Sequence, residues 1–359
     1  MNKSGTDKIR IKDIAQRANV SVGTVDRVLH NRGEVAAKTR KQVLDIVEEL
    51  GYTPNLLAKS LALKKTFRIA ALIPDSANDN PYWEKPLIGI QQAYSEIKDF
   101  HSIVNVYTFD NNSEATFIRS FHAILDEKPD GMVFTPVFFN ASLALIEKCD
   151  ELGIPYVFMD VNIEGCNNLA YFGQNAEQSG YLAAKLMHYM LSAGSHVLVL
   201  KPATKEGVTH HLRKREKGFL SFFLSDANRK RILTTSLEID ITSNRNNEES
   251  LAKIFSEQRM IDGIFVTNSR VFKVARYMAN SNLKEILLIG YDLIEKNLDF
   301  LEKGVINFLI GQKPEEQGYK SIQALFNFLL SGKKSEKTNF SPIDIIMKEN
   351  IDYYKNYKF

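Results

Sequence analysis

The spacing of apolar residues over the first fifty positions predicts three short helices. Positions 11, 14, 15 and 18 are apolar, which is the i, i+3, i+4, i+7 pattern of one helix face. Ser21 can cap a second helix over residues 22–29, and a third helix follows from residue 36 or 37 to residue 50, where Gly51 ends it. Two short helices joined by a three-residue turn, with a polar outer face on the second, are typical of a helix-turn-helix.

From residue 67 onward the pattern changes to short apolar strands that alternate with amphipathic helices. The first predicted strands cover residues 68–74, 103–109, 131–135 and 155–159, with helices near 86–98, 114–126 and 140–152. A second series covers 196–201, 232–239, 263–267 and 286–291, and a last strand is predicted over 341–347. The alternation predicts two α/β lobes with parallel sheets, so the fold class is α/β with an all-α helix-turn-helix head. Such lobes bind ligands beyond the carboxyl ends of their strands.

The charge of the chain is unevenly distributed. The net charge is +3 over 359 residues, but residues 1–67 hold thirteen Lys and Arg against seven Asp and Glu, or +6, which leaves −3 for the remainder. A basic head indicates contact with a polyanion, although a solvated charged surface gives the same number. Two cysteines are too few for a disulfide framework, and no apolar run approaches the ~20 residues that cross a bilayer. Since the first residues also lack the apolar stretch of a signal peptide, we expect a cytoplasmic protein with no membrane partner.

Short motifs in the head carry more information than its periodicity. The chain contains Lys12-Asp13-Ile14-Ala15, Val20-Ser21, Thr24-Val25, Arg27-Val28-Leu29, Lys38-Thr39-Arg40, Gly51-Tyr52 and Pro54-Asn55. Together these motifs resemble the DNA-binding head of the lactose-repressor (LacI/GalR) family. The resemblance implies that the second helix enters the major groove of an operator half-site. It also implies that residues 54–62 form a hinge helix that folds on DNA, with Leu61 wedged into the minor groove. The alternative makes Leu61 a core residue of an ordinary linker helix.

The resemblance assigns DNA contacts to particular side chains. The base-reading positions are Val22, Gly23 and Arg27. Arg27 can bind guanine through two hydrogen bonds, which discriminates against other bases by about 1–3 kcal/mol. Asp26 departs from the serine usual in the family, so no known operator sequence is carried over. Contacts to phosphate or the hinge site are expected at Lys12, Ser21, Thr24, Asn31, Thr39, Arg40, Asn55, Ala58 and Leu61.

The body resembles the sugar-binding core of the same family, which shares its fold with periplasmic binding proteins. Polar and aromatic residues at the expected strand ends carry this resemblance. The implied ligand-binding residues are Asn80, Tyr82, Trp83, Asp160, Arg215, Asn268, Asp292 and Gln312. Carboxylates accept hydrogen bonds from sugar hydroxyls, Arg donates in a fork, amides do both, and aromatic rings cover the C–H face of a sugar. The alternative is that these residues cap helices or form surface ion pairs.

Together these features predict a transcription regulator, expected to be a repressor, whose affinity for operator DNA is controlled by a small sugar-like effector. We expect a homodimer on a near-palindromic operator. The alternative is a solute-binding protein of transport or chemoreception, which requires export. An enzyme is not expected, because the sequence lacks phosphate-cradling loops and hydrolase motifs. No catalytic residue, cofactor or metal site is predicted; the pair His210-His211 lacks further ligands at metal spacing and is expected at the rim of the cleft.

The predicted domains follow from these assignments. Residues 1–53 form the head, 54–66 the hinge, and 67–359 the two-lobed core for ligand binding and dimerisation. The N-lobe is predicted over 67–161 with a return near 293–325, and the C-lobe over 162–292 with 326–359.

Overall fold

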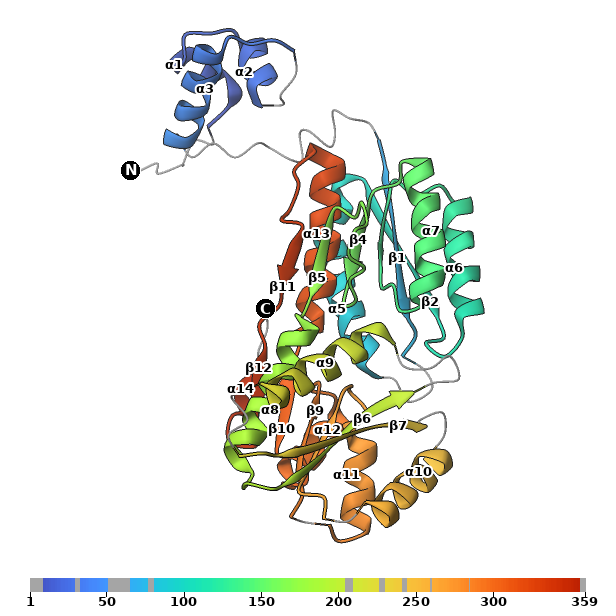
Figure 1. Cartoon of the computed structure of the whole chain (residues 1–359). Coiled ribbons are helices and arrows are strands. Elements are labelled where there is room, and N and C mark those ends of the chain that lie inside the picture. The colour runs from blue at the N-terminus through green and yellow to red at the C-terminus, as the bar shows by residue number, and fades with distance from the viewer. Residues whose placement is uncertain are drawn as a thin grey trace, which may run out of the picture. The chain divides into compact units, whose positions relative to one another are not determined.

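The computed structural model describes residues 9–29, 33–50, 65–76, 81–203, 209–225, 230–240, 244–258, 260–283 and 285–355 (Figure 1). The chain folds as two compact units, Met1–Lys65 and Thr66–Phe359. Within the described ranges, no helix is both long enough and apolar enough to cross a membrane.

The first unit contains three packed helices, α1 (Ile11–Arg17), α2 (Val22–Leu29) and α3 (Ala37–Glu49), at the predicted positions. Ile14, Val25 and Val43, one from each helix, are fully buried between them. The predicted N-cap of α2 is confirmed, because the Ser21 hydroxyl oxygen accepts a 3.1 Å hydrogen bond from the backbone N–H of Thr24. The cap fixes where α2 begins and leaves its outer face exposed.

The first lobe of the second unit is built on a six-stranded sheet in the order β11-β5-β4-β3-β1-β2, in which every pairing is parallel. Its strands are β1 (Phe67–Pro74), β2 (Ser102–Phe109), β3 (Gly131–Phe134), β4 (Tyr156–Met159), β5 (Ala170–Gly173) and β11 (Thr338–Phe340). The first face is covered by α6 (Glu114–Asp126) and α7 (Phe139–Leu152), and the second by α5 (Glu84–Ile97) and α13 (Pro314–Ser331) (Figure 1). The short helices η1 (Pro81–Trp83) and η2 (Lys98–Phe100) flank α5.

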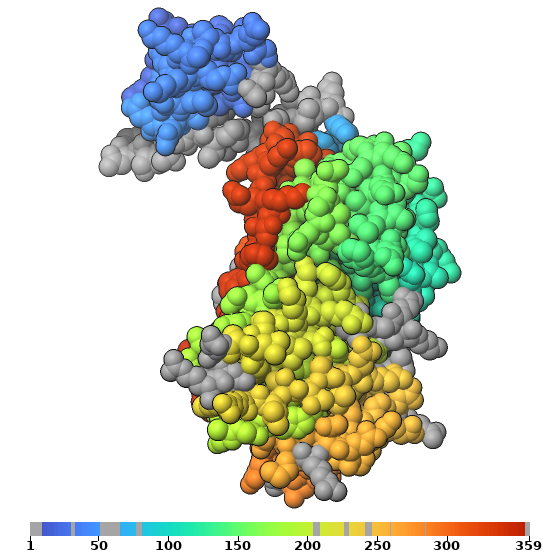
Figure 2. Space-filling view, viewed as in Figure 1, coloured from blue at the N-terminus to red at the C-terminus, as the bar shows by residue number. Residues whose placement is uncertain are grey.

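The second lobe repeats this architecture around the sheet β12-β10-β9-β8-β6-β7. Its strands are β6 (His196–Ala203), β7 (Leu233–Asp240), β8 (Gly263–Val266), β9 (Leu287–Tyr291), β10 (Phe308–Gly311) and β12 (Asp344–Ile346), and only β12 is antiparallel to its neighbour among the described strands. One face packs on α8 (Ala176–Met190) and α9 (His210–Leu224), and the other on α10 (Asn244–Glu257), α11 (Val271–Asn280) and α12 (Glu295–Glu302). The short helix α14 (Ile351–Lys355) follows β12. The outer surface of α10, orange-yellow, lies on the face seen in Figure 2.

The predicted α/β fold class with a helical head is confirmed, but the lobe boundaries differ from the prediction. The strand β5 belongs to the first lobe, whereas α12 and β10 belong to the second. The predicted strand 341–347 contains β12 of the second sheet, and β11 of the first sheet, which was not predicted, precedes it. Strands of three or four residues are too short to show a period, and the sheet that each one joins depends on tertiary packing. The chain thus passes between the lobes three times, after β5, after β10 and after β11.

Candidate functional site

One cavity gathers the candidate ligand residues of the second unit. Its lining includes seven of the eight predicted residues: Tyr82, Trp83, Asp160, Arg215, Asn268, Asp292 and Gln312. Asn80 lies outside the described residues. The space between these residues, with the solvent at its open mouth included, is about 630 Å³. The polar residues come from the carboxyl ends of β4, β8, β9 and β10 and from α9, so both lobes contribute to the lining.

Arg215, Gln312 and Asp292 form a buried network on the second lobe's side of the cavity. The Arg215 guanidinium donates to the Thr267 carbonyl oxygen at 2.8 Å and to Gln312 Oε1 at 2.5 Å. Gln312 Nε2 in turn donates to both carboxylate oxygens of Asp292, at 2.9 and 3.1 Å. The guanidinium also stacks over the Tyr291 ring, 3.8 Å from its centre. The network holds these three polar side chains in fixed orientations at the edge of the cavity.

The position of Arg215 depends on close packing of α8 against α9. A Cβ at Gly180 would lie 1.9 Å from the Arg215 carbonyl oxygen, and one at Gly218 would lie 1.8 Å from that of Glu177. Real Cβ atoms do not approach backbone atoms so closely, so both positions require glycine. The sequence Arg215-Glu-Lys-Gly218-Phe thus combines the cavity arginine with the glycine that brings its helix onto α8.

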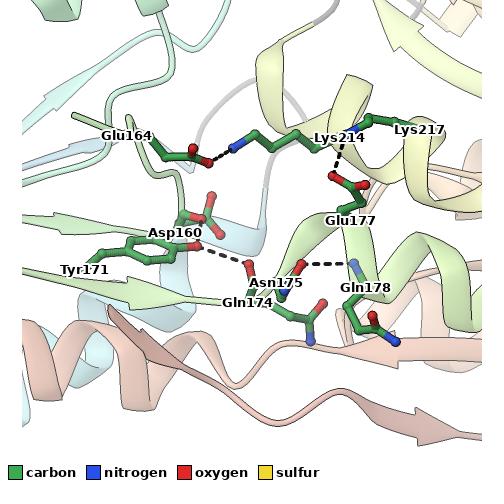
Figure 3. Close-up of polar contacts among 9 residues, drawn as sticks. All are labelled: Asp160, Glu164, Tyr171, Gln174, Asn175, Glu177, Gln178, Lys214 and Lys217. Carbon is green, nitrogen blue, oxygen red and sulfur yellow. Dashed lines mark hydrogen bonds and ion pairs between the residues drawn. The ribbon is translucent and has the colours of Figure 1, made fainter. Parts of the chain in front are cut away.

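The first lobe contributes Asp160 and two aromatic side chains. Asp160 follows β4 in a left-handed conformation, with φ of 65°, and Tyr82 donates to its Oδ1 at 2.7 Å. The Tyr171 hydroxyl donates to the Asp160 carbonyl oxygen at 3.0 Å (Figure 3). Trp83 meets Tyr82 edge to face, with ring centres 5.0 Å apart. Both aromatic residues are buried, and they form an apolar wall beside a carboxylate.

Asn297, which is fully buried, joins the loops that follow β8 and β9. Its Nδ2 donates to the carbonyl oxygens of Ser269, Tyr291 and Asp292, each at 2.8 or 2.9 Å. Its Oδ1 accepts from the backbone N–H of Phe272 at 3.0 Å. Asn297 was not predicted, since it lies on α12 and acts through the backbone of residues that line the cavity.

Burial shifts the pKa values of three side chains at the cavity. It raises the pKa of Asp292 to about 7, although the charge of Arg215 and the hydrogen bond from Gln312 act in the opposite direction. It also raises the pKa of Asp160, against the hydrogen bond from Tyr82 and the charge of Arg215. Burial, followed by the charge of Arg215, lowers the pKa of His211 to about 3. The cavity therefore presents a neutral imidazole at pH 7, and Asp292 exchanges its proton near neutrality.

Several buried polar atoms of the lining have no hydrogen-bond partner among the residues that the structure describes. They are Asn111 Oδ1, Thr209 Oγ1, His211 Nδ1 and Arg215 Nε. Unpaired buried polar groups are costly and occur where a ligand or water completes them. Sequence analysis missed Asn111 and Thr209. Asn111 follows β2 as Asp160 follows β4, so its strand-end position was an available signal. His211 was expected at the rim, whereas it lines the cavity; its neighbour His210 contacts the Phe139 ring of the first lobe.

In the described part of the chain, no three His, Cys, Asp or Glu side chains are placed to hold a metal ion. The candidate DNA residues of the first unit lie mainly on its surface. Val22, Gly23 and Arg27 are exposed on α2, and Arg27 Nε donates to the Gly23 carbonyl oxygen at 3.2 Å. Lys12 and Ser21 are exposed as well. The remaining described candidates, Thr24, Thr39 and Arg40, are half-buried. Asn31, Asn55, Ala58 and Leu61 lie outside the described residues.

Comparison with known proteins identifies both units. Residues 10–55 match the model of bacterial regulatory proteins of the lacI family, and residues 69–334 match a periplasmic binding protein domain. Catabolite control protein A of Priestia megaterium is 26% identical over 300 residues, 79% of this chain and 82% of that protein. The crystal structure of a putative LacI transcriptional regulator from Bacteroides fragilis is similar with a TM-score of 0.75 and 31% identity, covering 81% of this chain and all of that one.

The fold of the second unit also occurs in transport proteins. GanP, a glucose-galactose binding protein from Geobacillus stearothermophilus, has a TM-score of 0.71 at 18% identity, covering 80% of this chain and 99% of that one. At that identity the likeness shows the fold alone, whereas the match of the helix-turn-helix distinguishes this chain as a regulator. The chain belongs to the LacI family of bacterial regulatory proteins, DNA-binding transcription regulators with a periplasmic-binding-protein-like core.

Proposed function

We propose that this regulator is a repressor whose affinity for its operator is controlled by a small neutral sugar bound in the cavity between the lobes. The single observation that carries the proposal is the lining of that cavity. Donors and acceptors from both lobes converge on it beside two buried aromatic rings, and four of its buried polar atoms lack partners within the described ranges of the chain. A polyhydroxylated ligand offers both donors and acceptors to such a site, and its C–H faces pack on aromatic rings.

The proposed sugar contacts follow from the hydrogen bonds already made. Asp160 has one carboxylate oxygen bonded to Tyr82, which leaves the other to accept from a hydroxyl. Arg215 uses one N–H of each terminal nitrogen within the protein, and its Nε–H, which has no partner among the described residues, is one donor available to the ligand. Asn268 and Asp292 complete the polar side, and Trp83 covers a ring face. No catalytic step is proposed, since the relatives are transcription regulators.

The proposed operator complex is a homodimer on a near-palindromic site. One helix-turn-helix makes too few base contacts alone, and paired half-sites mirror a two-fold axis of the protein. Val22, Gly23 and Arg27 would face the bases, while Lys12 and Ser21 would contact phosphate. The proposed domains are a head over 1–53, a hinge over 54–66 and an effector core over 67–359. A sugar that contacts both lobes favours the closed cleft, and a change in the angle between the lobes would alter the spacing of the paired hinges.

A thermal-shift screen of neutral pentoses and hexoses on the full chain tests the effector class. A ligand at 100 times its Kd stabilises the folded state by about 2.7 kcal/mol, and we expect this for at least one sugar. Arg215→Met should abolish the shift, whereas Arg213→Met, the same change at an exposed position of α9, should retain it. A near-UV spectrum like that of the wild type shows that the first variant is folded.

Selection of bound sequences from a random duplex pool tests the DNA half of the proposal. We expect a two-fold symmetric consensus, and a sugar that shifts the thermal transition should also change retention of that duplex. Enrichment of a sequence without two-fold symmetry would contradict the dimeric operator complex. Equal retention with and without a stabilising sugar would contradict effector control.

A further inference from the structure

A second polar cavity lies between the lobes next to the proposed effector site. It encloses about 780 Å³, its mouth included. Asp160, His211, Arg215 and Gln312 line both cavities and therefore stand between them. The remaining wall comes from the loop after β4, the crossover between β5 and α8, the first turns of α9, and Phe340 of β11. Figure 3 shows most of these elements, with Lys214 of α9 reaching toward Glu164 in the loop after β4.

Charges of both signs surround this second cavity, and two carboxylates there form ion pairs. Glu164 of the first lobe meets Lys214 of α9 at 2.8 Å, and Glu177 of α8 meets Lys217 of α9 at 3.0 Å (Figure 3). The other two charged side chains of the wall, Asp160 and Arg215, carry opposite charges and bond neutral groups. A charged ligand would have to separate one of these pairs, whereas a neutral ligand can use them as hydrogen-bonding groups. The wall therefore suits an uncharged polar molecule.

Phe340 gives the cavity an aromatic surface. Its side chain is 58% exposed, and it lines the cavity beside polar side chains. The ring meets Tyr171 edge to face at 6.3 Å, which fixes its orientation. An exposed ring beside amides and carboxylates matches the amphipathic surface of a sugar, whose C–H face is apolar and whose edges are hydroxyls.

Hydrogen-bonding capacity is also unused on this side. Gln174 is 4% exposed, and its Nε2 donates to the carbonyl oxygens of Gly311 and Pro342, at 2.9 and 3.1 Å. These two bonds fix the amide, yet its Oε1 has no partner in the described part of the chain. The same holds for Nδ1 of His211, which lines both cavities. A buried acceptor held in place without a donor is satisfied by a hydroxyl from a bound molecule or by water.

The residues that line both cavities come from different lobes. Asp160 belongs to the first lobe, and among the described residues its side chain bonds to Tyr82. Arg215 and His211 belong to α9, and in the described part of the chain no hydrogen bond joins either of them to Asp160. A small rotation of the lobes can therefore open a passage between Asp160 and these two side chains without breaking a hydrogen bond between them, and the Glu164–Lys214 pair joins the lobes beside it.

We infer that the second cavity is a subsite for a second sugar ring, stacked on Phe340, so that the effector is a neutral disaccharide or larger glycoside whose link passes between Asp160 and α9. The inference rests on the proposed sugar-binding function and adds the size of the ligand. It also assigns Gln174 Oε1 as the acceptor for a hydroxyl of the second ring.

Isothermal titration of the full chain with neutral hexoses and pentoses, and with the disaccharides built from them, tests the subsite. At least one disaccharide should bind ten-fold or more tightly than either of its component sugars. Phe340→Ala should weaken that disaccharide at least five-fold and leave its component monosaccharide unchanged. Tyr353→Ala, which removes another ring that is 81% exposed and lines neither cavity, should change neither affinity.

Two results would overturn the inference separately from the proposed function. If a monosaccharide binds as tightly as every disaccharide that contains it, the effector does not extend beyond the first cavity. If Phe340→Ala weakens both sugar sizes equally, the ring acts on the lobes as a whole and not on a second sugar. If no sugar of either size binds, the proposed effector class itself is wrong, and the subsite falls with it.

Discussion

Replacing Asp292 by Asn should remove a pH-dependent part of the stability of the core. Burial raises the pKa of this carboxyl from 3.8 to about 7 in the folded protein, so the folded protein holds the proton more tightly than the unfolded chain. The resulting stabilisation is complete below the unfolded pKa and is lost as the pH rises through 7. Asn is a near-isosteric neutral substitute and tolerates the left-handed backbone of this position, where φ is 71°.

The expected size of the effect follows from the two pKa values. As the pH rises from 5.5 to 8, Asp292 loses its proton, and this lowers the free energy of unfolding of the wild type by about 2 kcal/mol. The variant has no carboxyl here and shows no such change. His211 acts in the opposite direction by roughly 1 kcal/mol, because its pKa is lowered to about 3, but it does so in both proteins and cancels in their difference. The variant also loses one of the two hydrogen bonds from Gln312, which costs about 1 kcal/mol at every pH.

Differential scanning calorimetry of both proteins from pH 5.5 to pH 8 measures this difference. For a core of this size the unfolding entropy is about 0.6 kcal/mol/K, so the Tm of Asp292→Asn should gain about 3 °C on the wild type across the range. Asp126→Asn, which removes an exposed charge at the end of α6, serves as the control and should give a nearly constant offset. A constant offset for Asp292→Asn as well would show that this carboxyl does not titrate near neutrality and would refute the reasoning.

Four further substitutions test the packing of the second unit and the DNA contacts of the head. Gly180→Val places a side chain where even a Cβ meets the Arg215 carbonyl oxygen at 1.9 Å. In denaturant titrations it should lower the free energy of unfolding by at least about 1–3 kcal/mol, and it should abolish any thermal shift with sugar. Asn297→Ala removes four hydrogen bonds in the core and should cost at least about 3 kcal/mol, which a lowered urea midpoint would reveal. In DNA-binding assays, Arg27→Ala should relax specificity at one base pair by about 1–3 kcal/mol, whereas Lys12→Ala should weaken all duplexes alike and reduce the salt slope by about 1.

Sequence alone could place at the cavity those residues that directly follow a predicted strand. Asp160, Asn268 and Asp292 each follow a short apolar run, and the carboxyl ends of parallel strands meet at one edge of a sheet. Asn111 obeys the same rule after β2 and could have been found with it. The helices of the head were predicted within one residue at each end, because their apolar period and the Ser21 cap are local features.

The residues that sequence could not place depend on contacts between distant segments. His211 lies on α9, and its burial requires the other lobe to approach that helix. Asn297 makes its bonds from a helix whose own sequence shows only an amphipathic pattern. The lobes predicted for the segments that contain β5 and β10 were wrong for a related reason. Four apolar residues fit either sheet, and only the completed fold decides which sheet they join.

The side chain of Gln174 connects the three crossovers between the lobes. One of the crossovers also carries a residue of the proposed effector site, so a ligand in that site can respond to a movement of the lobes. Gln174 lies in the first crossover, and its amide nitrogen donates to Gly311 at the second and to Pro342 at the third. Gln312, the residue after Gly311, bonds the carboxylate of Asp292 at the cavity. A rotation of the lobes must change backbone angles at all three crossovers, and it therefore moves Asp160 of the first lobe relative to Gln312 and Asp292 of the second. A ligand that contacts residues of both lobes will bind one lobe angle better than another, and that difference in affinity is the free energy available to shift the lobes.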